Sequence, residues 1–453
     1  MALNEDLDVF GHQPPLHKLY TQIALCYAVA DAEATHANIE VIRGGLTVLS
    51  KSFPWTAGQV VQDEKGNLRI QNLDKAPRLT IKDYSNDKEI PSLEQMRRAK
   101  FPFSMLNESI VAPCPTLSHS IDGPVPTFLV QANILRGGLL LTFNAGHDVM
   151  DLVGQHFIMH LLSKACKGEP FTPEDLTIGN PNRPSMIPLL DTNYHPGPEL
   201  APQRIPPAPT TSTPEGTAPT SPFPPSSPAT WSYFLFSPTS LAALKSHTTS
   251  TLPSSSPHIS TDDALTALLY TRLTAARSSR LPPSTPISLA RAVDARRYLS
   301  LPGTYPGLCQ NMTYHTFSVE ELVSLPLGTI ALDLRCAIDA ATSDVGFRTR
   351  ALATALTRAT AEERAGFSFT ANIDGPKDMM LSSWSKVEMY EVDFGWGKPE
   401  AVRRPGFDGV EGLVYFMPKR GDGEVVVGVF LRGEDLERLR RDEVWGRWAE
   451  FIG

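Results

Sequence analysis

The clearest pattern of hydrophobic and polar positions lies in the second quarter of the chain. Two apolar runs, 128–135 and 139–144, are separated by an Arg-Gly-Gly turn, which predicts a β-hairpin with a buried second strand. Beyond Gly146, apolar residues recur at helical spacing over 152–164, which predicts a helix. Residues 147–151 therefore form a strand-to-helix loop, where a rigid scaffold can hold a side chain at a cleft.

The rest of the chain mixes predicted strands and helices in both halves. Their order neither alternates strictly nor segregates by type, so we expect an α/β protein with mixed (α+β) sheets, one in each half. The other predicted strands are 19–28, 68–71, 230–236, 287–293, 379–387, 412–417 and 424–431, and the other predicted helices are 39–52, 238–247, 261–276, 327–341, 344–356 and 433–451.

A stretch rich in Pro, Ser and Thr divides the chain. Residues 196–228 contain 12 of the 40 prolines, which is incompatible with a packed helix or strand. A structureless segment of this length is implausible inside one compact domain. We therefore predict an N-terminal domain over 1–195, a linker over 196–229 and a C-terminal domain over 230–453.

Composition bounds the class of protein. The 453 residues, 41% hydrophobic and 20% charged, are typical of a globular protein large enough for two domains. A net charge of -8 argues against a nucleic-acid partner. The five cysteines are widely spaced and form no C-x-x-C pair, which favours a reducing compartment. With no signal peptide and no long apolar run, we expect a cytoplasmic protein without a membrane partner.

The predicted loop carries the sequence His147-Asp-Val-Met-Asp151. An imidazole can take up and return a proton at neutral pH, so His147 is a candidate general base. Taken alone, this box has ordinary alternatives: His147 could make only a local hydrogen bond, and Asp151 could be the N-cap of the following helix.

A second cluster contains Asp393, followed by Gly395 and Gly397 on either side of a tryptophan. The two glycines suit a sharply bent loop, and a buried Asp393 would require a cation or an N–H partner. Arg296, which follows a predicted strand, could supply that cation.

These two boxes together resemble the motifs of the plant and fungal acyl-CoA-dependent acyltransferases of the BAHD superfamily. That superfamily combines an HxxxD box with a downstream DFGWG box, here at 147–151 and 393–397. Within it the chain is most similar to the fungal trichothecene 3-O-acetyltransferases. The similar segments are 19–23, 54–59, 161–166, 260–265, 291–296, 310–315, 397–400 and 415–419.

The resemblance implies a two-domain, chloramphenicol-acetyltransferase-like fold with the active site at the domain interface. It implies direct transfer of an acetyl group from acetyl-CoA in a ternary complex. His147 would take the acceptor hydroxyl proton and return a proton to the CoA sulfur. The chain has no G-x-S-x-G elbow for a covalent acyl-enzyme, and we expect no metal and a monomer.

Further roles follow from the resemblance alone. The stretch that contains Ser382 and Trp384 would stabilise the oxyanion, Asp151 would orient the base, and Asp393 would be a structural residue paired with Arg296. The remaining implied positions are Ser260, Thr261 and Ser383 for CoA, and Gly395 and Gly397 for the shape of the second loop.

The acceptor is less determined, because Asp148 departs from the small residues of the trichothecene enzymes and could raise the pKa of His147 or contact an acceptor. We predict acetylation of a hydroxyl of a fungal secondary metabolite, a trichothecene or related sesquiterpenoid, at C-3 by resemblance. Another acyl-CoA, or an amine, polyketide or alkaloid acceptor, remains an alternative.

Other readings come from different classes of protein. One is a catalytically silent binding protein on the same fold. A zinc hydrolase would use His156 and His160, and a serine hydrolase would use Ser383 and Lys386, but neither pair has its companion motif.

Overall fold

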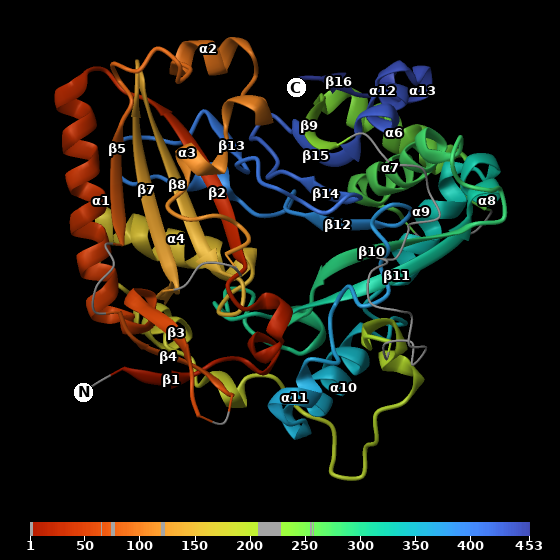
Figure 1. Cartoon of the computed structure of the whole chain (residues 1–453), viewed down its shortest axis with the longest axis horizontal. Coiled ribbons are helices and arrows are strands. Elements are labelled where there is room, and N and C mark those ends of the chain that lie inside the picture. Colours follow the sequence, from red (N-terminus) through yellow and green to blue (C-terminus); the bar gives the residue numbers. More distant parts are fainter. Residues whose placement is uncertain are drawn as a thin grey trace, which may run out of the picture.

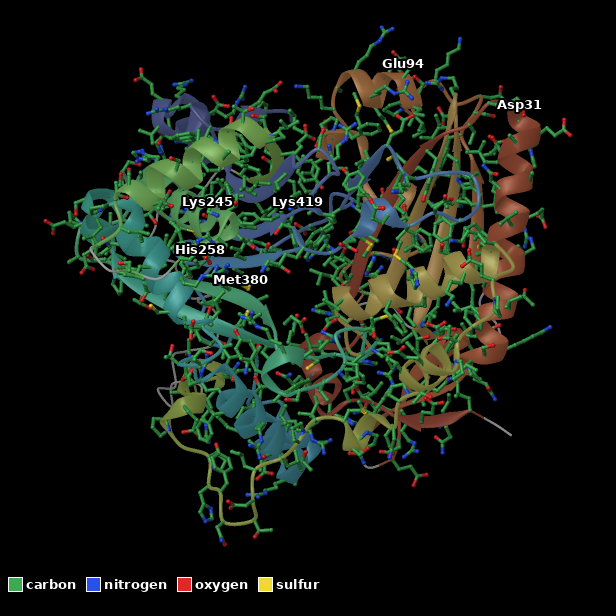
Figure 2. All side chains as sticks on the ribbon, turned by 180° about the vertical axis from the view of Figure 1, so that it is seen from behind. Asp31, Glu94, Lys245, His258, Met380 and Lys419 are labelled. Atoms are coloured by element: carbon green, nitrogen blue, oxygen red, sulfur yellow. The ribbon has the colours of Figure 1, made fainter. Side chains whose placement is uncertain are left out.

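The computed structural model describes residues 3–64, 66–73, 78–118, 123–206, 228–253, 256 and 258–453. Two large mixed sheets lie side by side, each with helices packed on it (Figure 1). Asp31 and Glu94 lie at the periphery, whereas Met380, a residue of the second sheet, lies toward the middle of the molecule (Figure 2). No helix among the described residues is long and apolar enough to cross a membrane.

The first sheet has five strands in the order β13-β2-β8-β7-β5. Helix α1 packs along α4, and both contribute apolar residues to the core that includes the inner positions of this sheet. Pairing is antiparallel except between β5 and β7. The strands are β2 (Tyr20–Ala28), β5 (Leu79–Asp83), β7 (Phe128–Leu135), β8 (Gly138–Gly146) and β13 (Ala401–Arg403), and the helices are α1 (Ala32–Ser52) and α4 (Leu152–Cys166).

The second sheet has seven strands in the order β11-β10-β12-β14-β15-β9-β16. Strand β12 is parallel to both of its neighbours, and the other pairs are antiparallel. The strands are β9 (Ala229–Phe236), β10 (Pro286–Asp294), β11 (Gln310–Ser318), β12 (Met379–Ser383), β14 (Leu413–Phe416), β15 (Val425–Arg432) and β16 (Glu450–Phe451).

Helix α7 (Thr261–Arg277) is the central helix of this half, and it packs against α6, α8, α9 and α12. The Tyr270 hydroxyl donates to the backbone oxygens of Ile287 and His315, which fixes α7 on β10 and β11. The other helices here are α6 (Pro238–Ser250), α8 (Val319–Ser324), α9 (Leu327–Cys336), α10 (Val345–Arg358), α11 (Ala361–Arg364), α12 (Gly433–Arg441) and α13 (Glu443–Gly446).

A smaller four-stranded sheet, in the order β1-β4-β3-β6, completes the N-terminal half. It consists of β1 (Asn4–Asp6), β3 (Gly58–Gln62), β4 (Leu68–Asn72) and β6 (Val125–Pro126). The remaining short helices are α2 (Leu93–Arg98), α3 (Glu108–Val111) and α5 (Pro173–Gly179).

The prediction of a mixed sheet in each half is confirmed, as is the hairpin before His147. The helix predicted over 433–451 is wrong as a single element. Asp442 has extended backbone and ends α12, its side chain accepts from the backbone N–H groups of Val444 and Trp445, and the chain then joins β9 as strand β16. The strand predicted over 379–387 ends at Ser383 because a turn at Ser385 and Lys386, closed by the bond from Val387 N–H to Trp384 O, follows it.

The predicted linker at 196–229 lies largely outside the described residues, which omit 207–227. The division into two domains at this linker therefore stays a prediction. Strand β13 adds a feature that was not predicted, because it follows the linker in sequence yet pairs with β2 in the first sheet.

Candidate active site

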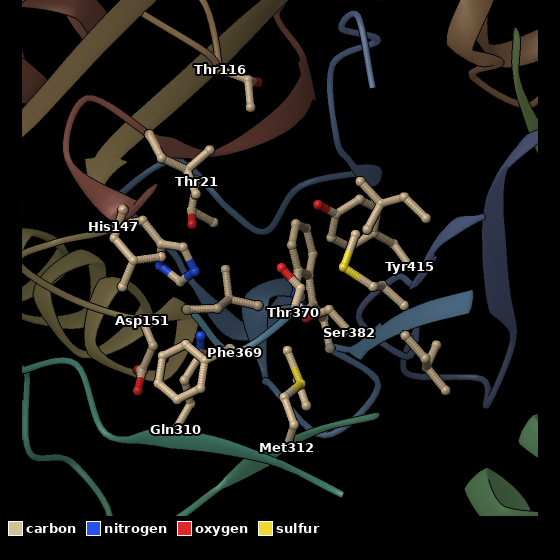
Figure 3. A pocket seen from close by; sticks show the side chains of 18 of the residues that line it. Thr21, Thr116, His147, Asp151, Gln310, Met312, Phe369, Thr370, Ser382 and Tyr415 are labelled. Carbon is tan, nitrogen blue, oxygen red and sulfur yellow. Dashed lines mark hydrogen bonds between the residues drawn. The ribbon is translucent and has the colours of Figure 1, made fainter. Parts of the chain in front are cut away.

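A cavity of about 390 Å³ is lined by residues from both large sheets. The first sheet contributes the end of β2 and the loop after β8, and the second contributes β10, β12 and β14. Figure 3 shows His147 on one side of this cavity and Ser382 and Tyr415 on the other. Residues that are distant in sequence, from the two ends of the chain, thus share one cavity.

His147 is held by the turn that follows β8. Its backbone N–H donates to Leu19 O at 2.8 Å, and its ring Nδ1 lies 3.4 Å from Met150 O. Nδ1 therefore carries the proton and donates to this carbonyl, which leaves the lone pair on Nε2. Burial lowers the pKa of His147, so the imidazole is neutral at pH 7 and competent to accept a proton.

Asp148 has no contact with the cavity. It is fully buried, and its Oδ2 lies 2.9 Å from His17 Nδ1. This pair ties the loop of His147 to the segment that includes Leu16 and Leu19, both of which line the cavity. The hypothesis that Asp148 contacts an acceptor is therefore wrong. The suggestion that Asp148 raises the pKa of His147 agrees with the sign of its charge, but burial of the imidazole is the larger effect and the pKa is lowered overall.

Asp151 connects the two halves of the chain. Arg296 donates from Nη1 and Nη2 to its two carboxylate oxygens at 2.9 and 2.8 Å, and both side chains are buried. The carboxylate also accepts from the backbone N–H groups of Gly154 and Cys309, each at 2.9 Å. A Cβ on Gly154 would lie 2.2 Å from Pro306 O, so a side chain there would push this loop away. Asp151 thus caps α4 and at the same time binds the second half.

Ser382 and Ser383 end strand β12, and their hydroxyl groups have different partners. The indole Nε1 of Trp384 donates to Ser382 Oγ at 2.9 Å, so the Ser382 proton remains available to a ligand. Ser383 Oγ donates to Asp262 Oδ2 at 2.9 Å. Both serines and Trp384 line the cavity, but the geometry favours Ser382 as the hydrogen-bond donor.

The second motif lies away from the cavity and has a different partner from the one expected. Asp393 Oδ1 accepts from the backbone N–H groups of Gly395 and Gly397 at 2.8 and 2.9 Å. The pairing of Asp393 with Arg296 is therefore wrong, because Arg296 is occupied by Asp151 and Asp294. Although partial burial opposes ionisation, these N–H groups hold the pKa of Asp393 below its ordinary value.

The glycines of this motif shape its loop. Gly395 and Gly397 have φ values of 114° and 105°, which disfavour other residues. Phe394, which lies between Asp393 and Gly395 in the sequence, stacks on Phe143 of β8, and the two ring centroids are 5.6 Å apart. The DFGWG loop therefore packs the second half of the chain onto the first sheet.

The residues predicted to contact CoA lie near one another, because the Ser383 hydroxyl donates to Asp262, the residue after Thr261, but they do not all line the cavity. Ser383 lines the cavity, whereas Ser260 and Thr261 are absent from its lining. Ser260 is the N-cap of α7 in a capping box with Asp263, so its ordinary capping role is present. Its role toward CoA stays a prediction.

The zinc alternative has no structural support among the described residues. His156 and His160 line a separate cavity together with Glu174 and Asp175. No group of three or more potential metal ligands is found in the described part of the chain.

Sequence reasoning missed Arg404, which lies at the wall of the cavity directly after β13. Its guanidinium lies 4.4 Å from the ring centroid of Phe407 and 4.8 Å from that of Tyr415. No motif marks this position, and only the pairing of β13 with β2 brings it to the site.

Comparison with known proteins identifies relatives that match the whole chain. The model of the trichothecene 3-O-acetyltransferase-like N-terminal domain matches residues 19–166. The O-acetyltransferase dmxR13 of Cryptosporiopsis sp. is 44% identical over 100% of this chain and 98% of its own. Trichothecene 3-O-acetyltransferase TRI101 of Fusarium sporotrichioides is 43% identical over 99% of this chain and 97% of its own.

The crystal structure of Fusarium sporotrichioides TRI101, complexed with coenzyme A and T-2, has the same fold. It superposes with a TM-score of 0.90 at 41% identity and covers all of both chains. The fold and the shared cavity define an acyl-CoA-dependent acyltransferase. The chain belongs to the trichothecene 3-O-acetyltransferase-like family.

Proposed function

We propose that this protein transfers the acetyl group of acetyl-CoA to a hydroxyl of a fungal secondary metabolite, with His147 as general base. The observation that carries the proposal is that the half-buried imidazole of His147 faces the available hydroxyl of Ser382 across one cavity. The family supplies the donor, because the related TRI101 is complexed with coenzyme A.

The reaction follows from the hydrogen bonds of the two groups. Nε2 of His147 accepts the hydroxyl proton of the acceptor as its oxygen attacks the thioester carbon. The Ser382 hydroxyl donates to the carbonyl oxygen as it becomes negative, while Trp384 holds Ser382 in place. The imidazolium then gives its proton to the departing CoA sulfur, which regenerates neutral His147.

Asp151 acts in this scheme through position rather than contact. Both of its oxygens are bound by Arg296 and backbone N–H groups, so it has no free oxygen to direct at a substrate. It fixes the start of α4, and with it the backbone of the turn that carries His147.

The acceptor we propose is a trichothecene or a related sesquiterpenoid, acetylated at its C-3 hydroxyl. The support is the identity of 43% to TRI101 and of 40% to a Saccharomyces cerevisiae protein of the same name. We further propose that the enzyme works in the cytoplasm as a monomer. The free cysteines, two of them fully buried, suit a reducing compartment.

The experiment uses purified protein, acetyl-CoA and a panel that contains deoxynivalenol, other terpenoid alcohols and matched amines. We expect CoA release that depends on the acceptor, and a product that carries one acetyl group by mass spectrometry. Transfer to amines in preference to alcohols would contradict the proposal, and so would full activity in a folded His147→Gln variant.

A further inference from the structure

Arg404 places a positive charge at one end of the cavity. The side chain is only 2% exposed and lines the cavity wall near Thr116. Its Nη1 and Nη2 make two long hydrogen bonds, to Gln22 O at 3.4 Å and Thr116 Oγ1 at 3.3 Å, and its Nε has no partner. Arg404 is the one Lys or Arg among the described residues that line this cavity.

Comparison with the other buried arginines shows that this arrangement is unusual. Among the described residues, eight arginines are buried, and six of them lie within ion-pair distance of a carboxylate. These six are Arg183, Arg277, Arg291, Arg296, Arg348 and Arg432.

Arg403 and Arg404 have no such carboxylate. The Arg403 guanidinium instead donates to the backbone oxygens of Lys100, Phe101 and Val402. Arg404 is thus left with the fewest partners for its charge. The rings of Phe407 and Tyr415 stabilise a cation but do not neutralise it.

The acidic residues of the cavity do not balance this charge. Asp151 and Asp294, the two carboxylates in its lining, both bind Arg296. The side chain of Asp294 is also 46% exposed, so water screens it. The end of the cavity near Arg404 is therefore electropositive.

Apolar side chains line the same cavity. Phe407 lies against the Arg404 guanidinium, and Leu117 and Val410 line the cavity although they are 41% and 51% exposed. In such surroundings a charge acts over a longer range than in water. A ligand with an apolar ring body and an electron-rich oxygen would complement this end in both shape and charge.

We propose that Arg404 is a specificity-determining residue, which selects acceptors that carry a second, electron-rich oxygen and disfavours acceptors that carry a protonated amine. The electron-rich oxygen is that of a carbonyl, an ester, a carboxylate or an ionised hydroxyl group. This inference deepens the proposed function and rests on it, because it takes the cavity to be the acceptor site.

The test compares three ring compounds of similar size and different charge: benzoate, benzyl alcohol and benzylamine, which is protonated at pH 7. Ligand-observed NMR titration in the absence of acetyl-CoA gives their dissociation constants. We expect benzoate to bind at least tenfold more tightly than benzylamine, with benzyl alcohol between them. The Val410→Trp variant, which fills the exposed rim, should weaken all three and so assign the signal to this cavity.

The variants separate charge from fold. Arg404→Met should reduce the difference between benzoate and benzylamine to less than threefold, whereas Arg404→Lys should keep their order. Arg403→Met is the matched control, because it removes a neighbouring buried arginine outside the cavity lining and should keep the order as well.

Equal or tighter binding of benzylamine by the wild-type protein would overturn the inference, as would a preference that persists in Arg404→Met. If Arg404→Met does not fold, the titrations of the wild-type protein and of Arg404→Lys test the inference, because both proteins must bind benzoate more tightly than benzylamine. These titrations measure binding and not turnover. The protein can therefore transfer acetyl groups without showing the charge preference, or show the charge preference without transferring acetyl groups, so the two proposals fail separately.

Discussion

The two motif loops of this enzyme each contain an aspartate, but the two aspartates act over different distances. Asp151, in the loop of His147, is buried and bound by Arg296 from the other half of the chain. Asp393, in the DFGWG loop, is only partly buried and is bound by two N–H groups of its own loop. One aspartate joins two halves at the site of the chemistry, whereas the other closes a single turn.

This difference follows from what each loop must hold. The turn of His147 lies at a cavity, and the ion pair of Asp151 with Arg296 holds it to the other half of the chain. The DFGWG loop already packs on Phe143 through Phe394, so its aspartate has only to complete the bend. The two motif aspartates therefore have unlike physical roles.

The largest expected effect comes from the loop of His147. Removing a general base costs about 10²- to 10⁴-fold in rate, so His147→Gln should lower kcat/KM by that order. Gln is similar in size and the histidine is only half-buried, so the thermal midpoint should change little. Steady-state assays and thermal melts check both. A folded variant with near-wild-type turnover would contradict the mechanism.

The next largest effect concerns the ion pair between Asp151 and Arg296, which joins the two halves of the chain. Arg296→Met leaves Asp151 buried without its cation, which costs about 3–5 kcal/mol in the free energy of unfolding. We expect a loss of that size in urea unfolding, together with a loss of activity.

Lys398→Met, which removes an exposed ion pair with Glu391, is the matched control and should cost less than about 1 kcal/mol. An Arg296→Met protein as stable as the wild type would remove the distinction between the two aspartates.

The sequence predicts the regular elements of the fold where their hydrophobic period is strong, as in the hairpin before His147 and in α7. It fails where an element depends on a distant partner. The strand Gln310–Ser318 is mostly polar, with Met312, Tyr314 and Phe317 as its only large apolar or aromatic residues besides His315, so its strand signal is weak and its pairing with β10 defines it. The three residues of β13 likewise carry too little periodic signal.

The same limit holds for the site. Motifs identify His147 and both aspartates, because these residues recur with fixed spacing. The partner of Asp151 could not be deduced from spacing, since Arg296 has two candidate aspartates and only the folded chain distinguishes them. Arg404 carries no motif at all and reaches the cavity only through a strand that crosses to the other sheet.

The third prediction concerns the donor that faces His147. Loss of one oxyanion donor costs about 10²- to 10³-fold, so Ser382→Ala should reduce kcat by that factor and leave the Km for acetyl-CoA nearly unchanged. Ser383→Ala should have a smaller effect on kcat, because that hydroxyl donates to Asp262. Steady-state kinetics with both substrates varied would check this. A larger loss of kcat in Ser383→Ala than in Ser382→Ala would mean that Ser383, and not Ser382, is the oxyanion donor.

A smaller effect is expected from the second motif loop. Asp393→Asn removes the negative charge of a carboxylate that accepts two backbone N–H bonds. We expect the interaction of this charge with the two N–H groups to contribute about 1–2 kcal/mol to the free energy of unfolding. Activity per folded molecule should stay close to that of the wild type. Because the pKa of Asp393 is lowered in the folded protein, its stabilising contribution should be present at neutral pH and be lost as pH falls through that pKa. A fully stable but inactive variant would place Asp393 in the chemistry and abolish the contrast with Asp151.

The smallest expected change is the pH dependence of the wild-type enzyme near neutrality. Burial lowers the pKa of His147 from its ordinary value of 6.5, and the base must be neutral to act. The value of kcat/KM should therefore be nearly constant at and above neutral pH, and should fall on the acid side with a midpoint below 6.5. The profile of Asp393→Asn should have the same midpoint, since that loop is outside the cavity. A midpoint above 6.5 would show that nearby carboxylates outweigh burial at His147, and a shifted midpoint in Asp393→Asn would show that the second loop also controls the base.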